Sequence, residues 1–240
     1  MVGPVELLLV SVLAIAGPSA AVVGQTPEHV TRAESGVPSG LPPSERPDDW
    51  LLAFVDVETT GLVPGYHEMI DIGLVVTDLD GNERDRFFLR IQPAHPERLA
   101  EGARRVNAFD AARWRELGAL GPAQAVGEIS SFHARAAAGK SVLLVAYNSQ
   151  FDTAFLDHLM RSEGRSWREL YHYFVLDLPS MAWSLGLRQL DGGELAEKLE
   201  LEDEPRIAEQ HTGLTGALLN ARIYRALLAF DPGPGGSPDR

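Results

Sequence analysis

The chain has 240 residues, a formal net charge of −13 at neutral pH and no cysteine. Its length suits one globular domain with an appendage, and a hydrophobic content of 45% excludes a wholly disordered chain. The absence of cysteine excludes disulfides, thiolate zinc sites and a cysteine nucleophile. The negative charge argues against nucleic-acid binding through a broad basic surface, although a nuclease whose carboxylates hold metal ions stays compatible with it.

The N-terminal part differs in composition from the rest. Residues 7–16 form an apolar run of the length of a signal-peptide core, but no Lys or Arg precedes it. We therefore expect an apolar leader at residues 1–24. The leader either acts as a signal or anchor through residues 7–21, giving a secreted or membrane-anchored protein, or is a tail of a cytoplasmic protein, which we favour.

Three further segments follow from composition. Residues 25–49 are rich in Pro, Ser, Gly and Glu and predict a disordered linker. Residues 50–230 carry the periodic apolar pattern of a folded domain, and residues 231–240 form a Pro- and Gly-rich flexible tail.

Strand and helix patterns alternate within the domain. Apolar runs predict strands at residues 51–55, 69–79, 86–91, 141–146 and 174–178. Helical patterns cover residues 97–106, 122–138, 152–161, 193–199 and 215–230. Three strands in a meander, followed by strands that alternate with helices, predict an α/β domain with a mixed sheet covered by helices.

Two carboxylates stand at the end of the first strand. Asp56 and Glu58 are two residues apart, so in a strand both project from the same face. Such a pair repels unless a proton or cation lies between its members, and Mg²⁺ and Mn²⁺ prefer these hard oxygen ligands. An Asp-x-Glu pair is common by chance, but its place after an apolar strand and before Thr59-Thr60-Gly61 makes a metal site a specific prediction.

Two more polar residues open helices. Asp152 follows the strand at residues 141–146 and lies in the first turn of a helix, where a negative charge is favoured in any case. His211 precedes the last helix. Each is therefore either an ordinary structural residue or part of a catalytic site.

Taken together, these clusters resemble the DEDD superfamily of 3′–5′ exonucleases, in its histidine-type branch with ribonuclease T and the proofreading subunits. Residues 54–62 match the first motif, an apolar strand that ends Asp-x-Glu-Thr-Thr-Gly-Leu. Asn148, Phe151 and Asp152 match the second motif, and His211 begins the third. The resemblance implies a ribonuclease H-like fold: a mixed five-stranded sheet, with the first three strands antiparallel, flanked by helices.

The resemblance also implies the chemistry. Two Mg²⁺ or Mn²⁺ ions would be held by Asp56, Glu58 and Asp152, with Asp56 bridging both, and His211 would accept the proton of the attacking water. The residues expected to contact substrate are Thr59, Leu62, Asn148 and Phe109. Phe109 either stacks on a base or is a core residue. Asp177 corresponds to a family aspartate with a structural role.

The third motif departs from the family. Aligned from His211, the fourth acidic ligand is replaced by Gly216, which has no side-chain oxygen. A second register would put Asn220 at that position and Thr215 in place of the histidine. We prefer the first register, because Leu214, Ala217 and Ala221 then also fall in family positions. Asn220 lies one turn from Gly216 and is a candidate for a water-mediated contact.

Two functions follow. The first is a working exonuclease with a weakened second metal site, and the second is a catalytically silent module that binds nucleic-acid ends or a protein. The expected ligands are single-stranded DNA or RNA 3′ ends, with Arg104, Arg105, Arg113 and Arg115 as a basic edge. Further candidate partners are a polymerase or another repair or replication protein, and a second copy in a homodimer. A membrane partner is not expected.

Overall fold

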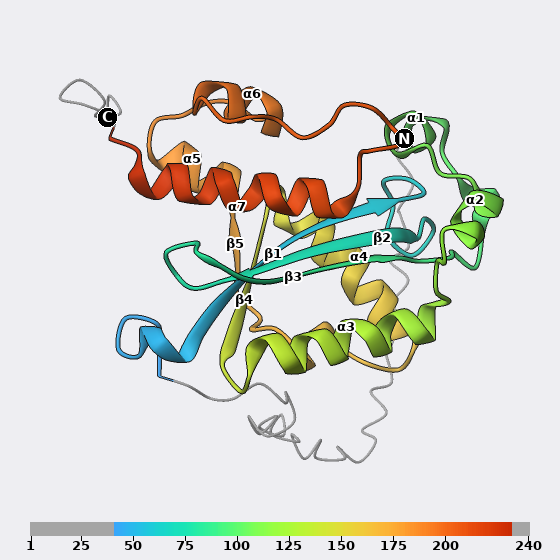
Figure 1. Cartoon of the computed structure of the whole chain (residues 1–240), viewed down its shortest axis with the longest axis horizontal. Coiled ribbons are helices and arrows are strands. Elements are labelled where there is room, and N and C mark those ends of the chain that lie inside the picture. The colour runs from blue at the N-terminus through green and yellow to red at the C-terminus, as the bar shows by residue number, and fades with distance from the viewer. Residues whose placement is uncertain (1–40, 232–240) are drawn as a thin grey trace, which may run out of the picture. The chain divides into compact units, whose positions relative to one another are not determined.

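The computed structural model describes residues 41–231 (Figure 1), so the predicted leader, most of the predicted linker and the tail from residue 232 lie outside the described residues. The end of the predicted linker, residues 41–49, contains the 3₁₀ helix η2 (Pro47–Asp49). The indole of Trp50 donates a hydrogen bond to the Leu41 carbonyl at 2.8 Å. This contact ties the segment to the folded domain.

Five strands form one mixed sheet. They are β1 (Trp50–Thr59), β2 (Met69–Thr77), β3 (Glu83–Arg90), β4 (Ser141–Ala146) and β5 (Val175–Asp177), in the spatial order β3-β2-β1-β4-β5. β1, β2 and β3 pair antiparallel, whereas β4 and β5 run parallel to β1. This confirms the predicted topology. β1 is longer than predicted and includes Asp56 and Glu58, because its pairing with β2 continues to Glu58↔Asp71.

Seven α-helices complete the described part of the chain. They are α1 (Glu101–Asn107), α2 (Ala111–Glu116), α3 (Pro122–Ala137), α4 (Ser149–Ser162), α5 (Leu178–Ser184), α6 (Gly192–Lys198) and α7 (Gly213–Ala229). Two further 3₁₀ helices are η3 (Pro96–Arg98) and η4 (Trp167–Glu169).

The helices α2 and α5 were not predicted from the sequence. Both are too short to show a helical period, but each begins at an aspartate that caps it: Asp110 accepts from the Ala112 and Arg113 amides, and Asp177 accepts from the Ser180 amide. The predicted helix at residues 97–106 is instead η3 followed by α1.

The sheet is covered on both faces (Figure 1). Leu51, Ala53 and Val55 of β1 belong to the core shared with α3 and α4, whereas Leu52 and Phe54 belong to the core shared with α5, α6 and α7. This alternation follows from the two-residue period of a strand. It places Asp56 and Glu58 on the α7 side, since they continue the series of Leu52 and Phe54.

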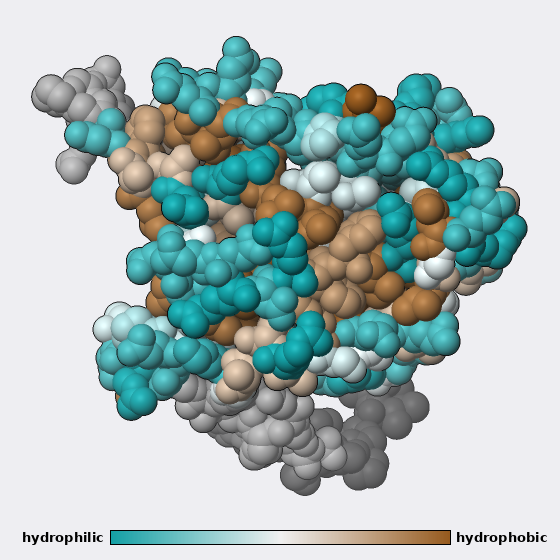
Figure 2. Space-filling model, in the orientation of Figure 1, coloured by the Kyte–Doolittle hydropathy of each residue, from teal (hydrophilic) through white to brown (hydrophobic). Residues whose placement is uncertain are grey.

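The surface between the helical layers is apolar in part. Figure 2 shows a strip of apolar surface over the strands between α7 and α3, with polar side chains around it. This agrees with the partial exposure of the edge strand β3. Among the helices of residues 41–231, none is both long and apolar enough to cross a membrane.

Candidate active site

Three predicted carboxylates gather at one end of β1. β1 pairs with β4 only as far as Phe54, so the backbone beyond it needs another partner on that side. The amide of Val57 donates to Oδ1 of Asp152 at 3.1 Å. Asp152 on α4 is thereby fixed beside Asp56 and Glu58, which flank Val57.

The start of α4 is held in place by backbone geometry and by a partly buried acid. Asn148 adopts a left-handed conformation with φ of 62° and turns the chain from β4 into the helix. Asp177, at the end of β5, accepts a hydrogen bond from the Ser149 amide at 3.0 Å and also caps α5. Asp177 therefore has a structural role, as the family resemblance implies, and its effect is to position Asp152.

His211 completes the cluster. Its Nε2 lies 3.0 Å from Oε1 of Glu58. Its Nδ1 lies 3.3 Å from the Pro205 carbonyl and 3.5 Å from Oε2 of Glu204. The hydrogen bond to Glu58 and the charges of Glu58 and Glu204 raise the pKa of His211 to about 9, against the opposing effect of burial. In the absence of other cations the ring is therefore protonated at neutral pH.

The centre carries excess negative charge. Burial, together with the charges of Asp152 and Glu58, raises the pKa of Asp56 well above its ordinary value. Burial likewise raises the pKa of Asp152, although it accepts a backbone hydrogen bond. These carboxylates therefore hold protons at pH values where isolated carboxylates are ionised. A bound cation would replace those protons and relieve the repulsion.

Whether a divalent ion fits depends on the side-chain rotamers. As they stand, no three His, Asp or Glu side chains within residues 41–231 are arranged to hold a metal ion. Glu58 faces His211 and also accepts from the Asn107 amide group, and Asp152 faces Val57. The donor set is nevertheless the one that Mg²⁺ and Mn²⁺ prefer. The residues fit a divalent cation if Glu58 exchanges its contact with His211 for the ion.

Gly216 is in tight contact with Asp56. A Cβ atom at residue 216 would lie 2.3 Å from Oδ2 of Asp56 and 2.5 Å from its carboxyl carbon. The space in which a side chain at 216 would begin is thus filled by the Asp56 carboxylate. The departure in the third motif is therefore more than a missing ligand, because the glycine lets Asp56 lie against α7.

The contacts of α7 favour the first register of the third motif over the alternative one. Asn220 is buried, and its Nδ2 donates to the Val55 carbonyl at 3.1 Å, so its amide group bonds to the sheet. Thr215 lies in the first turn of α7, where its side chain accepts from the Thr212 amide in a capping box. The residue that contacts the carboxylates is His211.

The predicted substrate residues differ in accessibility. Leu62 is 80% exposed and Asn148 is also exposed. Thr59 is buried, and its hydroxyl donates to the Gly61 carbonyl, so its side chain is engaged within the loop. Phe109 is 2% exposed and packs with Ile70 and Trp114. The expected stacking of Phe109 on a base is therefore wrong, and the core alternative holds.

Sequence reasoning missed three residues of the site. Asn107 donates from Nδ2 to Oε2 of Glu58 and to the Thr59 carbonyl. Asp71 on β2 is buried and accepts from the Gly213 amide at 2.9 Å, which fixes the start of α7. Glu204 faces His211 from the loop before α7. Asp71 had a signal, a carboxylate inside an apolar strand, whereas Glu204 belongs to no recognisable pattern.

A comparison with models of known protein families gave a match that covers most of the folded domain. The RNase T model, described as an exonuclease, matches residues 53–224. This range contains all the residues of the cluster described above. A search of curated proteins gave no match.

Solved structures resemble the fold. A structure of exonuclease I, reported in connection with its processivity, superposes with a TM-score of 0.62 at 15% identity, covering 76% of this chain and 41% of that chain. E. coli exonuclease I in complex with a 5cy-dT13 oligonucleotide gives a TM-score of 0.60 at 15% identity, over 76% and 41% of the two chains. The zinc-bound E. coli exonuclease I–ssDNA complex gives 0.61 at 15% identity, with the same two coverages. The present chain thus spans about 41% of the length of these proteins.

Proposed function

The chain belongs to the exonuclease family whose model it matches, and on this premise we propose that it is a metal-dependent 3′–5′ exonuclease. Its substrates are the 3′ ends of single-stranded DNA or RNA. The observation that carries this proposal is the cluster of Asp56, Glu58, Asp152 and His211, which come from three separate elements and meet at one end of β1. A structural role alone does not require Asp56 and Asp152 to lie beside Glu58, where burial and the charge of Glu58 raise the pKa of both carboxyl groups.

In this proposal the carboxylates of Asp56, Glu58 and Asp152 hold Mg²⁺ or Mn²⁺. When bound, such an ion lowers the pKa of its water and offsets negative charge on the scissile phosphate. Nε2 of His211 accepts the proton of the attacking water. For this the ring must first lose its own proton, and loss of the Glu58 contact favours that, since Glu58 is the largest cause of the raised pKa. Asn107 then remains as the neighbour that keeps Glu58 near the centre.

The assignment of substrate contacts rests on the positions of three residues in this chain and on the oligonucleotides bound in similar structures. Leu62 and Asn148 are exposed and follow or precede the cluster residues Glu58 and Asp152 closely in the sequence, and the backbone of Thr59 continues from Glu58. We assign these three residues to the terminal nucleotide. Exonuclease I has been solved with dT13 and dA16 oligonucleotides, which supports a single-stranded substrate here.

A second candidate function is a silent module that binds nucleic-acid ends without cutting them. The observation that favours it is Gly216, because the fourth carboxylate is missing and Asp56 fills the adjoining space. The retention of His211 and three carboxylates favours the active enzyme over this alternative.

The test is digestion of a single strand labelled at its 5′ end, as DNA and as RNA, with Mg²⁺ or Mn²⁺. We expect the natural chain to give a ladder that shortens from the 3′ end, and a strand with a blocked 3′ end to stay intact. Asp56→Ala should lower the rate at least about 100-fold, because loss of even an outer-shell partner costs about 10–100-fold. Binding without a ladder supports the silent module, and a natural chain no more active than Asp56→Ala overturns the enzyme.

The proposal also covers the domain bounds, the location and the partners of the protein. We place the catalytic domain at residues 50–230 in a cytoplasmic protein, with a polymerase or another replication or repair protein, or a second copy of this chain, as partner. Intact-mass measurement of the expressed protein tests whether the leader is removed, and size-exclusion chromatography with light scattering tests the homodimer.

A further inference from the structure

His211 is held on both sides of its ring. Nε2 faces Glu58, which the proposed function assigns to the metal centre, and Nδ1 faces the loop before α7. In that loop the Pro205 carbonyl and the Glu204 carboxylate lie 3.3 Å and 3.5 Å from Nδ1. Resting on the proposed function, we propose that Glu204 is the positioning residue of His211, which keeps a proton on Nδ1 and leaves Nε2 as the proton acceptor.

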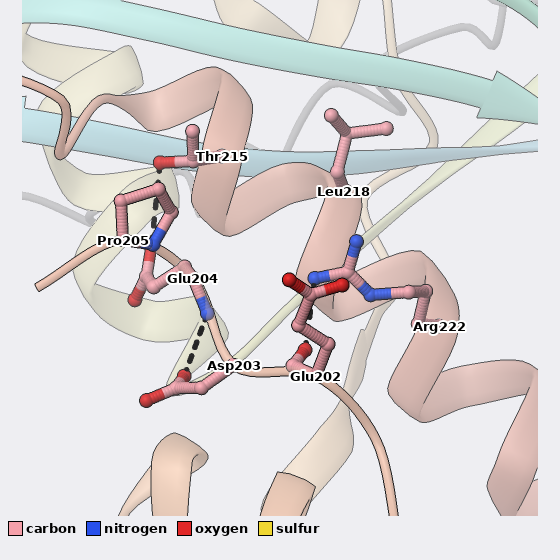
Figure 3. Close-up of a pocket in the computed structure, with 7 residues that line it drawn as sticks. All are labelled: Glu202, Asp203, Glu204, Pro205, Thr215, Leu218 and Arg222. Atoms are coloured by element: carbon pink, nitrogen blue, oxygen red, sulfur yellow. Dashed lines mark hydrogen bonds between the residues drawn. The ribbon is translucent and has the colours of Figure 1, made fainter.

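The place of Glu204 is set by its own neighbours. Its backbone amide donates to Oδ1 of Asp203 at 2.8 Å, and Oδ2 of Asp203 pairs with Nε of Arg206 at 2.7 Å. Figure 3 shows the Glu204 carboxylate turned towards Thr215 of α7, whose hydroxyl lies 3.5 Å from Oε2. The side chain is only 12% exposed. The carboxylate is therefore fixed between its own loop and α7, whose N-cap residue Thr212 directly follows His211.

Burial of the Glu204 carboxylate is energetically unfavourable unless a cationic partner offsets it. Burial raises the pKa of Glu204, and the nearby charge of Glu58 raises it further, while the His211 charge opposes both. On the outer side Glu204 lines a pocket of about 390 Å³ with Glu202 and Asp203, so more negative charge lies there. His211 is the cationic partner that lies closest, since Arg206 is 4.0 Å from the other carboxylate oxygen.

The contact between Glu204 and His211 would determine which nitrogen of the His211 ring is protonated. A neutral imidazole has one protonated nitrogen. The proton stays on the nitrogen that faces a hydrogen-bond acceptor. An acceptor at Nδ1 directs the lone pair of Nε2 to the reacting centre. The Pro205 carbonyl meets this need in part, but only the carboxylate also stabilises the positive ring that forms when Nε2 takes a proton. Glu204 therefore orients the ring and supports its charged form.

The test compares Glu204→Ala and Glu204→Gln with the control Glu202→Ala. Glu202 is a neighbouring acid in the same loop, exposed and attached to α7 only through its backbone carbonyl, which accepts from Arg222. The first measurement is the Nδ1–H signal of His211, read from the ring ¹⁵N shifts of metal-free, ¹⁵N-histidine-labelled protein at a pH at which the ring is neutral. We expect Nδ1 to carry the proton and Nε2 to be unprotonated in the natural chain and in Glu202→Ala, and this preference to be lost in Glu204→Ala.

The second measurement is turnover in the digestion assay. We expect Glu204→Ala to lower kcat about 10–100-fold with KM unchanged, and Glu204→Gln, which keeps an acceptor oxygen, to recover part of the loss. An unchanged Nδ1–H signal, or a changed signal with unchanged kcat, overturns the positioning role. If the natural chain does not cut, the proposed function fails, and the Nδ1–H signal alone then decides whether Glu204 holds the ring. Glu204→Gln, which has the size of the natural side chain, carries both measurements if Glu204→Ala does not fold.

Discussion

The close approach of Gly216 to Asp56 predicts that Gly216→Ala changes the stability of the fold in the direction opposite to that of an ordinary Gly→Ala substitution in a helix. Gly216 lies inside α7, where replacement of glycine by alanine normally stabilises a helix by about 1 kcal/mol. In this chain the added methyl group would lie 2.3–3.0 Å from three atoms of the Asp56 carboxyl group. We therefore expect Gly216→Ala to destabilise the fold.

The size of the effect follows from two opposing contributions. Forcing a side chain away from a well-packed place costs about 1–3 kcal/mol. Asp56 is short, and burial together with the charges of Asp152 and Glu58 already raises its pKa, so its carboxylate has little free space to move into. Set against the gain in helix propensity of about 1 kcal/mol, the net loss for Gly216→Ala should be about 0–2 kcal/mol.

The assay is urea unfolding in EDTA, with Gly127→Ala as the control. Gly127 lies within α3, is exposed, and has no atom within 4 Å of an added Cβ. The control should gain up to about 1 kcal/mol, so the two variants should differ by about 1–3 kcal/mol. If Gly216→Ala is stabilised as much as Gly127→Ala, Asp56 does not lie against α7 and the reasoning is refuted.

Three further predictions concern the core, a buried acid and the histidine. Phe109→Ala should destabilise the chain by about 3–5 kcal/mol in urea unfolding, because Phe109 packs with Trp114; a small loss accompanied by weaker oligonucleotide binding would restore the stacking role. Burial raises the pKa of Asp71 from 3.8 to about 7, so the folded chain holds a proton that the unfolded chain releases, and stability falls as the pH rises through this window. Asp71→Asn should remove this loss of stability with rising pH. The variant should be more stable than the natural chain at pH 8, by about 2 kcal/mol or more, and nearly as stable as the natural chain at pH 4. Equal pH profiles of the two chains would contradict the raised pKa of Asp71. Glu58→Gln should lower the pKa of His211 from about 9 towards its ordinary value in an NMR titration, and no change would mean that Glu58 is not the main partner of the ring.

Much of the fold could be predicted because its signals are local. Apolar runs located all five strands, and the two-residue period of β1 placed Asp56 and Glu58 on one face. The two helices that were missed, α2 and α5, are six and seven residues long. Their starts depend on a capping aspartate, which a periodicity argument does not see.

The site was predictable only where a motif carries it. Asp56, Glu58, Asp152 and His211 were found from motif order, and they lie together as expected. Glu204 and Asp71 act through tertiary contacts with residues seven and 142 positions away, to His211 and Gly213, so no local spacing reveals them. Phe109 was misassigned because a motif cannot tell a side chain that faces the core from one that faces a ligand.

The central claim is that this centre hydrolyses 3′ ends although glycine stands in place of the fourth acid. The most direct test is the ladder assay with Mn²⁺ on the natural chain, Asp56→Ala and Gly216→Asp, all confirmed as folded. We predict that the natural chain produces the ladder and Asp56→Ala does not. The claim is contradicted if the natural chain leaves the strand as intact as Asp56→Ala does while Gly216→Asp cuts it.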